Sequence, residues 1–181
     1  MKKITILTLF AAFLLVGISA NAQEQGEIRV GAGLALGTKA AIDDDGSEKM
    51  GIGINIGGEY FVTDVISVAP SYTFFFKSEI EQSGQSVSIQ YGSLNIDGRY
   101  YFGDGMFYGL AGLSFASGKS EFDFGSFGGS GSETDSEVGL NIGGGVMYPL
   151  SDGMFLNGQV KYNTPIEQLV INAGVAFTIG G

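Results

Sequence analysis

The stretch SLNIDGRYYFG, residues 93–103, alternates between apolar and polar side chains. One row along the chain consists of Leu94, Ile96, Tyr100 and Phe102, with Gly98 among them. The other row consists of Asn95, Asp97, Arg99 and Tyr101. Because successive side chains of a strand point to opposite faces, this period of two predicts a β-strand that carries an acid and a base on one face. Whether that face meets water, a catalytic pocket or the inside of a barrel decides the fold and the class of function.

The same alternation recurs in eight segments along the chain. They are residues 28–36, 52–60, 66–76, 87–102, 107–115, 138–148, 154–162 and 169–179. In the fourth segment the apolar parity changes near Gly92, which predicts a β-bulge at that glycine. Tight turns at 63–65, 103–105 and 151–153 alternate with longer connections at 39–49, 78–86, 117–137 and 163–167. This order predicts an all-β fold, an eight-stranded antiparallel up-and-down barrel with short turns at one end and long loops at the other.

The composition of the two rows indicates which face is inside. A soluble barrel of the lipocalin type would bury the apolar row and show water a surface rich in charged residues. Here the second row is mostly Gly, Ser, Ala, Asn and Thr, and the apolar row is too bulky for an eight-stranded lumen. The reverse arrangement, with the apolar row against lipid, predicts a transmembrane barrel. Aromatic residues near both ends of the segments fit the girdles of such barrels; they are Tyr60, Tyr100, Phe102, Phe107 and Tyr148 at one end and Phe74, Phe76, Phe115 and Tyr162 at the other.

The first 22 residues have the pattern of a secretory signal peptide. Lys2 and Lys3 precede a short apolar run, and Ala20-Asn21-Ala22 forms a small-residue cleavage site. We therefore expect residues 1–22 to be removed and residues 23–181 to form a single barrel domain. Because residues 1–22 contain two lysines and no acidic residue, their removal would change the formal charge from −10 to −12.

Composition excludes several functions. The chain contains no cysteine and no histidine, so neither a Ser-His nor a Cys-His catalytic arrangement can be built. Lys161 on an inward row near serines is a poor candidate for a Ser-Lys pair, so we expect no enzyme and no cofactor or metal site. The acidic charge argues against nucleic acid as a partner, since its binding depends on Lys and Arg.

Four segments share an internal repeat that places charged residues at one level. INIGGEY (54–60), LNIDGRY (94–100), LNIGGGV (140–146) and INAGVAF (171–177) align on their asparagines. The alignment puts Glu59 level with Arg99. Asp97 precedes Arg99 by two residues on the same face, and Arg29 lies near the same level of the predicted barrel. We predict that Arg29, Glu59, Asp97 and Arg99 form a charge network that plugs the lumen, because buried charges are costly unless paired.

The predicted long loops are strongly acidic. They contain 12 of the 19 acids: Asp43, Asp44, Asp45, Glu48, Glu79, Glu81, Glu121, Asp123, Glu133, Asp135, Glu137 and Glu167. Phe122, Phe124 and Phe127 lie in the third loop, and Phe122 and Phe124 share a parity, so this loop is a candidate surface-interaction ribbon that could recruit partners by strand addition. A solvated, flexible acidic loop is the alternative, and bridging of the acids to phosphorylated glycolipid by divalent cations is a further hypothesis.

The leader, the eight segments and the stretches NIDGRYYFG and QVKYN resemble the small outer-membrane β-barrels of Gram-negative bacteria, often labelled porin-family proteins. Outer membrane protein X and the membrane domain of outer membrane protein A are closest in kind. The resemblance covers about residues 27–179 and implies a monomer in the cell outer membrane, in contact with its lipid and glycolipid. We expect a structural or surface-interaction role, with an extracellular partner bound through the acidic loops. A narrow channel for small solutes and a soluble lipocalin-like carrier remain as alternatives.

Overall fold

The computed structural model describes residues 23–43, 47–82, 85–123 and 128–180, and its regular elements are all strands. The strands are β1 (Ile28–Ile42), β2 (Glu48–Phe61), β3 (Ile66–Phe75), β4 (Ser78–Gln82), β5 (Gln85–Phe102), β6 (Phe107–Asp123), β7 (Ser130–Ser151), β8 (Met154–Asn163) and β9 (Gln168–Gly180). In this part of the chain no helix is long and apolar enough to cross a membrane. The predicted signal peptide lies outside the described residues and stays a prediction.

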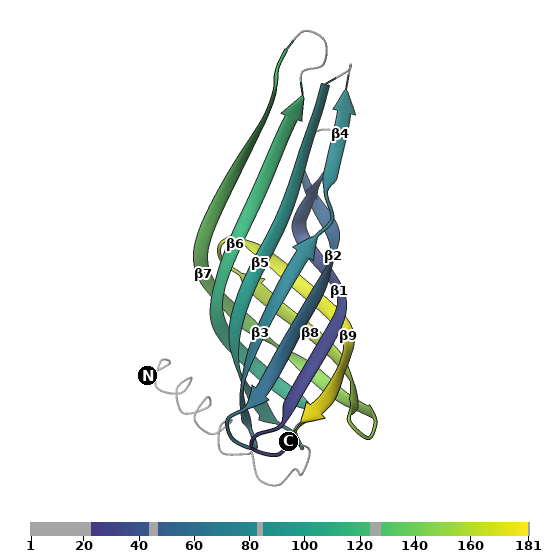
Figure 1. Cartoon of the computed structure of the whole chain (residues 1–181), viewed down its shortest axis with the longest axis vertical. Coiled ribbons are helices and arrows are strands. Elements are labelled where there is room, and N and C mark those ends of the chain that lie inside the picture. Colours follow the sequence, from purple (N-terminus) through teal and green to yellow (C-terminus); the bar gives the residue numbers. More distant parts are fainter. Residues whose placement is uncertain (1–22, 44–46, 83–84, 124–127, 181) are drawn as a thin grey trace, which may run out of the picture.

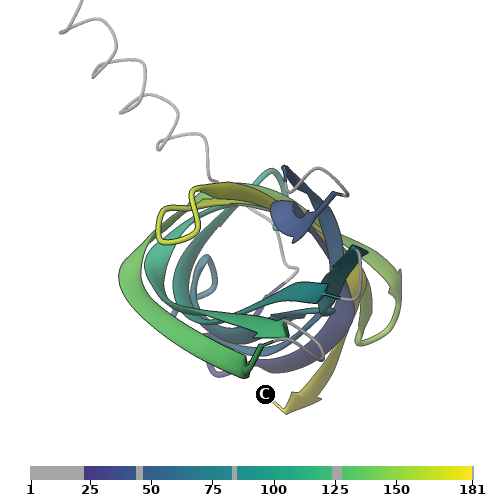
Figure 2. The same ribbon diagram turned by 90° about the horizontal axis from the view of Figure 1, so that it is seen from above.

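Each strand pairs with its neighbours in antiparallel register, and the sheet closes because β1 pairs with both β2 and β9. β3 and β4 are successive parts of one wall, since both pair with β5. The result is a closed barrel of eight strands, seen as a ring from above (Figure 2). The predicted fold class is therefore confirmed.

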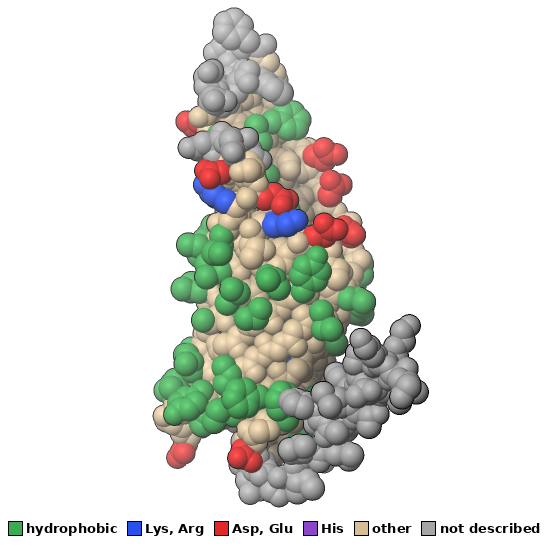
Figure 3. Space-filling view, turned by 180° about the vertical axis from the view of Figure 1, so that it is seen from behind, with side chains coloured by type: hydrophobic (Ala, Val, Ile, Leu, Met, Phe, Trp, Pro, Cys, Tyr) green, Lys and Arg blue, Asp and Glu red, His purple; other side chains and the backbone are tan. Residues whose placement is uncertain are grey.

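The two rows of each strand face opposite environments. In β5, Leu94 is 47% exposed, whereas Asn95 is fully buried and Asp97 nearly so. The same alternation runs round the barrel, so apolar side chains cover its outer face and polar side chains fill its interior. Figure 3 shows these hydrophobic side chains over the lower part of the molecule, with charged side chains gathered above them. A soluble carrier would need the opposite arrangement.

The barrel wall is uneven in height. β4, β5, β6 and β7 rise well beyond the other strands and form a raised ribbon (Figure 1). Pairing between β7 and β8 stops at Asn141 and Asn163, whereas pairing between β6 and β7 continues to Asp123 and Ser130. Much of the predicted loops 78–86 and 117–137 is therefore paired strand. We call the end with the raised ribbon the ribbon end and the opposite end the turn end.

The turn end has the three predicted tight connections. Between β5 and β6, Gly103, Asp104 and Gly105 all have positive φ angles (60°, 59° and 72°). Glycine adopts this left-handed conformation without the steric cost that a side chain brings, which explains the two glycines that flank the aspartate.

The predicted β-bulge in β5 at Gly92 is wrong, and the one-residue irregularity at this level lies in the neighbouring segment, between β3 and β4. Phe74 pairs with Gly92 and Ser78 with Ile89, which leaves three residues between the β3 and β4 partners against two in β5. β5 pairs with β6 without a register shift from Ser86 to Phe102. Val87, Ile89 and Tyr91 therefore share the inward parity of Asn95 and lie on the inner face of the ribbon. The apolar parity changes there because the strand leaves the lipid, so its outer face no longer needs apolar side chains. A register shift does occur in β1, between Gly37 and Ala41.

Candidate functional site

Arg99, Glu59 and their partners form the first buried cluster of the lumen. Arg99 donates from Nη1 to Glu59 Oε2 (2.9 Å) and from Nη2 to Gln159 Oε1 (3.1 Å). Glu59 Oε1 also accepts hydrogen bonds from the hydroxyls of Tyr101 (2.7 Å) and Ser67. The guanidinium of Arg99 thus links β5 to β2 on one side and to β8 on the other.

Asp97, two residues away on the same face, belongs to a different ion pair. Lys161 Nζ of β8 lies 3.0 Å from Asp97 Oδ2, and both side chains are almost completely buried. Asn141 Nδ2 donates to Asp97 Oδ1 (2.9 Å) and to Asn95 Oδ1 (2.9 Å), which joins two of the asparagines of the repeat. Because β8 lies three strands from β5 in the sheet, the Lys161 side chain spans part of the lumen.

Arg29 forms a third pair, with a partner on its own side of the barrel. Its Nε donates to Glu27 Oε1 (2.7 Å), which also accepts from the Thr178 hydroxyl (2.7 Å). The guanidinium carbon lies 4.7 Å from the ring centre of Phe61 and 4.1 Å from that of Phe155, in cation–π geometry. Arg29 and Glu59 are opposite each other in the β1–β2 register, although Arg29 forms an ion pair with Glu27 and Glu59 forms one with Arg99.

The four predicted residues therefore lie inside the barrel at neighbouring levels but divide among three ion pairs. Sequence reasoning missed Glu27 and Lys161 as partners. Both carried a detectable signal, since Glu27 precedes Arg29 by two residues and Lys161 lies on the inward row of its segment. What the sequence did not indicate was how far around the barrel each side chain reaches.

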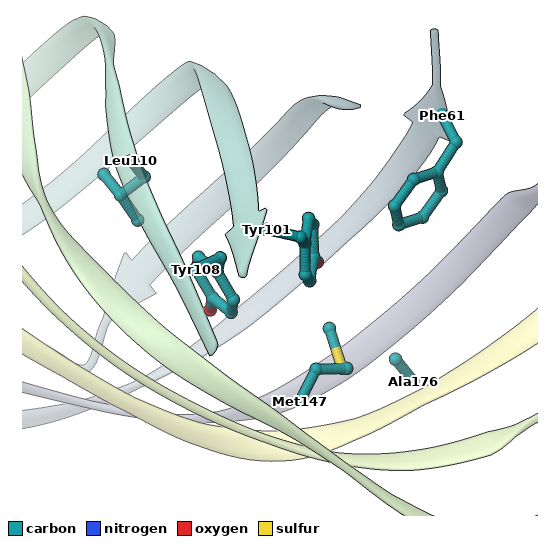
Figure 4. Packing of buried hydrophobic residues seen from close by; sticks show 6 residues of the cluster. All are labelled: Phe61, Tyr101, Tyr108, Leu110, Met147 and Ala176. Carbon is teal, nitrogen blue, oxygen red and sulfur yellow. The ribbon is translucent and has the colours of Figure 1, made fainter. Parts of the chain in front are cut away.

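Aromatic side chains fill the lumen on the turn-end side of these pairs. Phe61, Tyr101, Tyr108 and Met147 pack together with Leu110 and Ala176, as Figure 4 shows. The Tyr101 ring lies 5.3 Å from that of Phe61 and 5.2 Å from that of Tyr108. Towards the ribbon end a second cluster of buried residues contains Ala35, Ala40, Phe75 and Val170, with Tyr91 packed against it.

The segment before β1 crosses the turn end. Gly26 N donates to Phe61 O (2.9 Å), and Gln23 Nε2 donates to Gly105 O (2.7 Å) in the β5–β6 turn. In the order of strands around the ring, that turn lies opposite β1. Residues 23–27 therefore form a strap beneath the aromatic cluster.

A small cavity remains beside the Arg99 cluster. Its volume is about 50 Å³, and its lining includes Arg29, Asn55, Glu59, Arg99 and Asn172. Among the described residues, the buried Nε of Arg99 and both polar side-chain atoms of Asn172 have no hydrogen-bond partner. A polar cavity of this size holds a few water molecules, which would satisfy these atoms.

Outside the lumen, the outer face of the ribbon carries an exposed ion cluster. Glu121 lies between Lys77 (2.7 Å) and Lys119 (2.5 Å), and Lys77 also approaches Glu79 (3.8 Å). Hydrogen bonds and charge from Lys119 and Lys77 lower the pKa of Glu121 from 4.5 to about 2. The pKa of Lys77 is raised by the same contact with Glu121.

We expect this cluster to persist in mild acid. A carboxyl whose pKa is lowered by folding stabilises the folded ribbon above its ordinary pKa of 4.5, and that contribution disappears as the pH falls through about 2. NMR of the labelled Glu121 carboxyl should give a midpoint near pH 2, and the Lys77→Met, Lys119→Met double variant should move it towards 4.5. A midpoint near 4.5 in the unaltered protein would mean that the cluster does not form.

Of the predicted interaction residues, Phe122 is exposed on β6, while Phe124 and Phe127 lie outside the described residues. Phe122 has inward parity, so it shares the inner face of the ribbon with Val87, its partner in the β5–β6 register. Asp44 and Asp45 are also outside the described residues. In the part of the chain that is described, no three acidic side chains come together in a way that could hold a metal ion.

A closed β-barrel with an apolar outer face and a packed polar interior defines an integral membrane protein that crosses the bilayer with strands. Residues 8–178 match the family described as "Outer membrane protein beta-barrel domain", and the chain belongs to this family. No curated protein sequence matches it. The protein is therefore located in the cell outer membrane of a Gram-negative bacterium, as the sequence predicted.

Solved structures support the same fold. Ail, the attachment invasion locus protein of Yersinia pestis, in complex with the heparin analogue sucrose octasulfate, is 19% identical with a TM-score of 0.64; the match covers 86% of this chain and 99% of Ail. Neisserial surface protein A is 16% identical with a TM-score of 0.56, over 88% of this chain and 100% of that one. The N-terminal barrel of Pseudomonas aeruginosa OprF is 19% identical with a TM-score of 0.54, over 87% and 100%. At these identities the likeness concerns the fold alone.

Proposed function

We propose that this protein is a closed, non-enzymatic barrel that anchors a raised β-ribbon at the cell surface, for envelope integrity or for contact with an extracellular partner. The observation that carries the proposal is the division of the molecule into a packed lumen and a ribbon that continues β5, β6 and β7 beyond the barrel wall. In this orientation the turn end faces the periplasm and the ribbon end faces the outside.

The charges of the lumen support a closed interior. Each buried cation has a buried or partly buried anion within hydrogen-bond distance; the pairs are Arg29–Glu27, Arg99–Glu59 and Lys161–Asp97. An eight-stranded barrel has room only for its own side chains, and paired side chains leave no net charge to attract an ion. The aromatic cluster and the strap of residues 23–27 close the turn end further.

One observation favours the narrow channel as a second candidate. The cavity of about 50 Å³ is bordered by Gly31, Gly33, Gly57 and Gly174, so the lumen is least crowded beside β1, β2 and β9. A connected file of water would require the aromatic cluster to move, since Phe61 and Tyr101 are fully buried within it.

Conductance in planar bilayers separates the two candidates. We expect the purified protein to insert without steady single-channel steps. A variant with Glu59→Ala, Arg99→Ala and Tyr108→Ala, which removes one ion pair and part of the aromatic cluster, should conduct if it folds, and heat-modifiable migration on gels checks folding. Steady steps from the unaltered protein would overturn the closed lumen and favour the channel.

The ligand named for Ail does not transfer directly to this chain. Sucrose octasulfate is a polyanion, whereas the described residues of the ribbon end carry ten acids against four lysines. The acids are Asp43, Glu48, Glu79, Glu81, Glu121, Asp123, Glu133, Asp135, Glu137 and Glu167, and the lysines are Lys39, Lys49, Lys77 and Lys119. Polyanions would be repelled at this surface. An extracellular partner of this protein would need to be neutral or cationic.

A further inference from the structure

The upper part of β7 is a free sheet edge. On one side, residues 130–140 pair with β6; on the other, pairing with β8 ends at Asn141. The last contacts on the open side link Leu140 to Thr164, whose backbone N–H donates to Leu140 O and whose hydroxyl accepts from Leu140 N. Above this point no strand of the described chain pairs with the open edge of β7.

The contacts of Leu140 show which backbone groups point outward. In an antiparallel sheet the N–H and C=O of one residue point to the same neighbour, and alternate residues point to alternate neighbours. Because the backbone N–H and C=O of Leu140 point to the β8 side, the backbone groups of Ser132, Thr134 and Ser136 point to that side as well. Their backbone donors and acceptors form a template for an added strand.

The side chains next to this edge form an acidic row on the inner face of the ribbon. Glu133, Asp135 and Glu137 pair in register with Ser120, Gly118 and Ala116, and the burial of Ala116 identifies this side as the inner one. Asp135 and Glu137 also line a pocket of about 580 Å³ at the mouth of the barrel, together with Tyr91, Glu48, Lys39 and Glu167. Four acids and one lysine give this pocket a negative charge.

We propose that the open edge of β7 binds an extended segment of a partner protein that carries Lys or Arg at alternate positions. The segment would pair with Ser132, Thr134 and Ser136 through its backbone. Its basic side chains would then lie on the inner face, about 5 Å from Glu133, Asp135 and Glu137. This inference rests on the proposed surface-contact role and specifies its partner.

The charge pattern excludes a second copy of this chain at the same edge. An antiparallel copy would bring its own Glu133, Asp135 and Glu137 against these acids, and like charges directly opposite are destabilising. The chain has no basic segment to supply instead, since no three Lys or Arg alternate anywhere in its sequence. On the outer face of this edge lie the uncharged side chains of Ser132, Thr134 and Ser136. The outward-facing side chains of the bound segment therefore need not carry a charge.

A pair of synthetic peptides tests the proposal. The probe is fluorescent Thr-Lys-Val-Lys-Thr-Lys-Thr with blocked ends. The comparison is Thr-Lys-Lys-Val-Thr-Lys-Thr, which has the same composition but no two lysines two residues apart. With the full barrel in zwitterionic nanodiscs at low salt, we expect the alternating peptide to bind at least about tenfold more tightly by anisotropy. Equal affinities would mean that the peptides bind through their net charge alone, and would contradict binding at the open edge of β7.

Matched variants locate the site. Glu133→Gln, Asp135→Asn, Glu137→Gln should weaken binding of the alternating peptide about tenfold or more, because three cross-strand ion pairs are lost. Asp64→Asn, Asp104→Asn, Asp152→Asn makes the same change of net charge in the turns of the other end and should leave binding unchanged. If both triple variants weaken binding equally, the acidic row is not the site.

Amide hydrogen exchange gives a readout that charge alone does not change. On peptide binding, amide exchange should slow at Thr134 and Ser136, whose N–H groups face the open edge. It should not change at Asp135, whose N–H group faces β6. Thr134→Pro removes an edge donor without breaking the β6 ladder and should abolish this protection. Binding without selective protection would contradict strand addition. It would leave the closed lumen untouched, because the conductance experiment tests that separately.

Discussion

Lys161→Met is expected to lower the free energy of unfolding by about 3–5 kcal/mol, because it leaves the Asp97 carboxylate buried without its counter-charge. The two side chains are 1% and 2% exposed and lie 3.0 Å apart. Asn141 would still donate to Asp97, but one amide does not replace an ammonium group. Urea titration in detergent micelles, followed by the heat-modifiable shift on gels, measures the change.

Two further variants make this result specific. Lys49→Met removes a lysine whose pair with Asp43 is about half exposed, and such pairs contribute only about 0–1 kcal/mol. Asp97→Asn, Lys161→Met removes both charges and should recover much of the lost stability, because no unpaired charge remains in the lumen. If Lys161→Met costs no more than Lys49→Met, the Lys161–Asp97 pair is not a structural element of the closed barrel.

The direction of each strand face was predictable because it follows from local alternation. Leu94 and Asn95 are neighbours with opposite character, and a barrel in lipid has only one way to place them. No tertiary information is needed for that step. The closed fold, the orientation of the stretch 93–103 and the outer-membrane location followed from the same reasoning.

The partners of the lumen charges were harder to predict because they depend on register. The repeat placed Glu59 level with Arg99, and the two do form an ion pair. Lys161 reaches Asp97 only because the stagger of β5, β6, β7 and β8 brings them to one depth, and no local pattern encodes this stagger. The parity change at Gly92 was misread for a related reason, since a change of surroundings and a change of register leave the same trace in a sequence.

Glycines on the inner face explain how Lys161 crosses the lumen. Gly143 of β7 is the register partner of Lys161, and an ideal Cβ there would lie 2.2 Å from Val160 O and 2.6 Å from Lys161 Cα. Gly112 of β6 is the partner of Asp97, and its Cβ would lie 2.3 Å from Ile96 O and 2.5 Å from Asp97 Oδ1. Any side chain at either position would collide with backbone or with the ion pair itself.

Gly143→Leu should therefore destabilise the barrel by about 3 kcal/mol or more, beyond the usual cost of overpacking, because the obstructing atoms are backbone and the Lys161 side chain would be displaced from Asp97. Gly109→Leu is the matched control. It lies on β6 between the inward Tyr108 and Leu110, so it faces lipid, and a Cβ there would meet nothing within 4 Å. Urea titration should show Gly109→Leu at least as stable as the unaltered protein.

In the Lys161→Met background, the loss of stability caused by Gly143→Leu should be smaller, because the ion pair that the leucine displaces is already absent. Purely additive costs would mean that the glycine accommodates the neighbouring strand and not the lysine that crosses it.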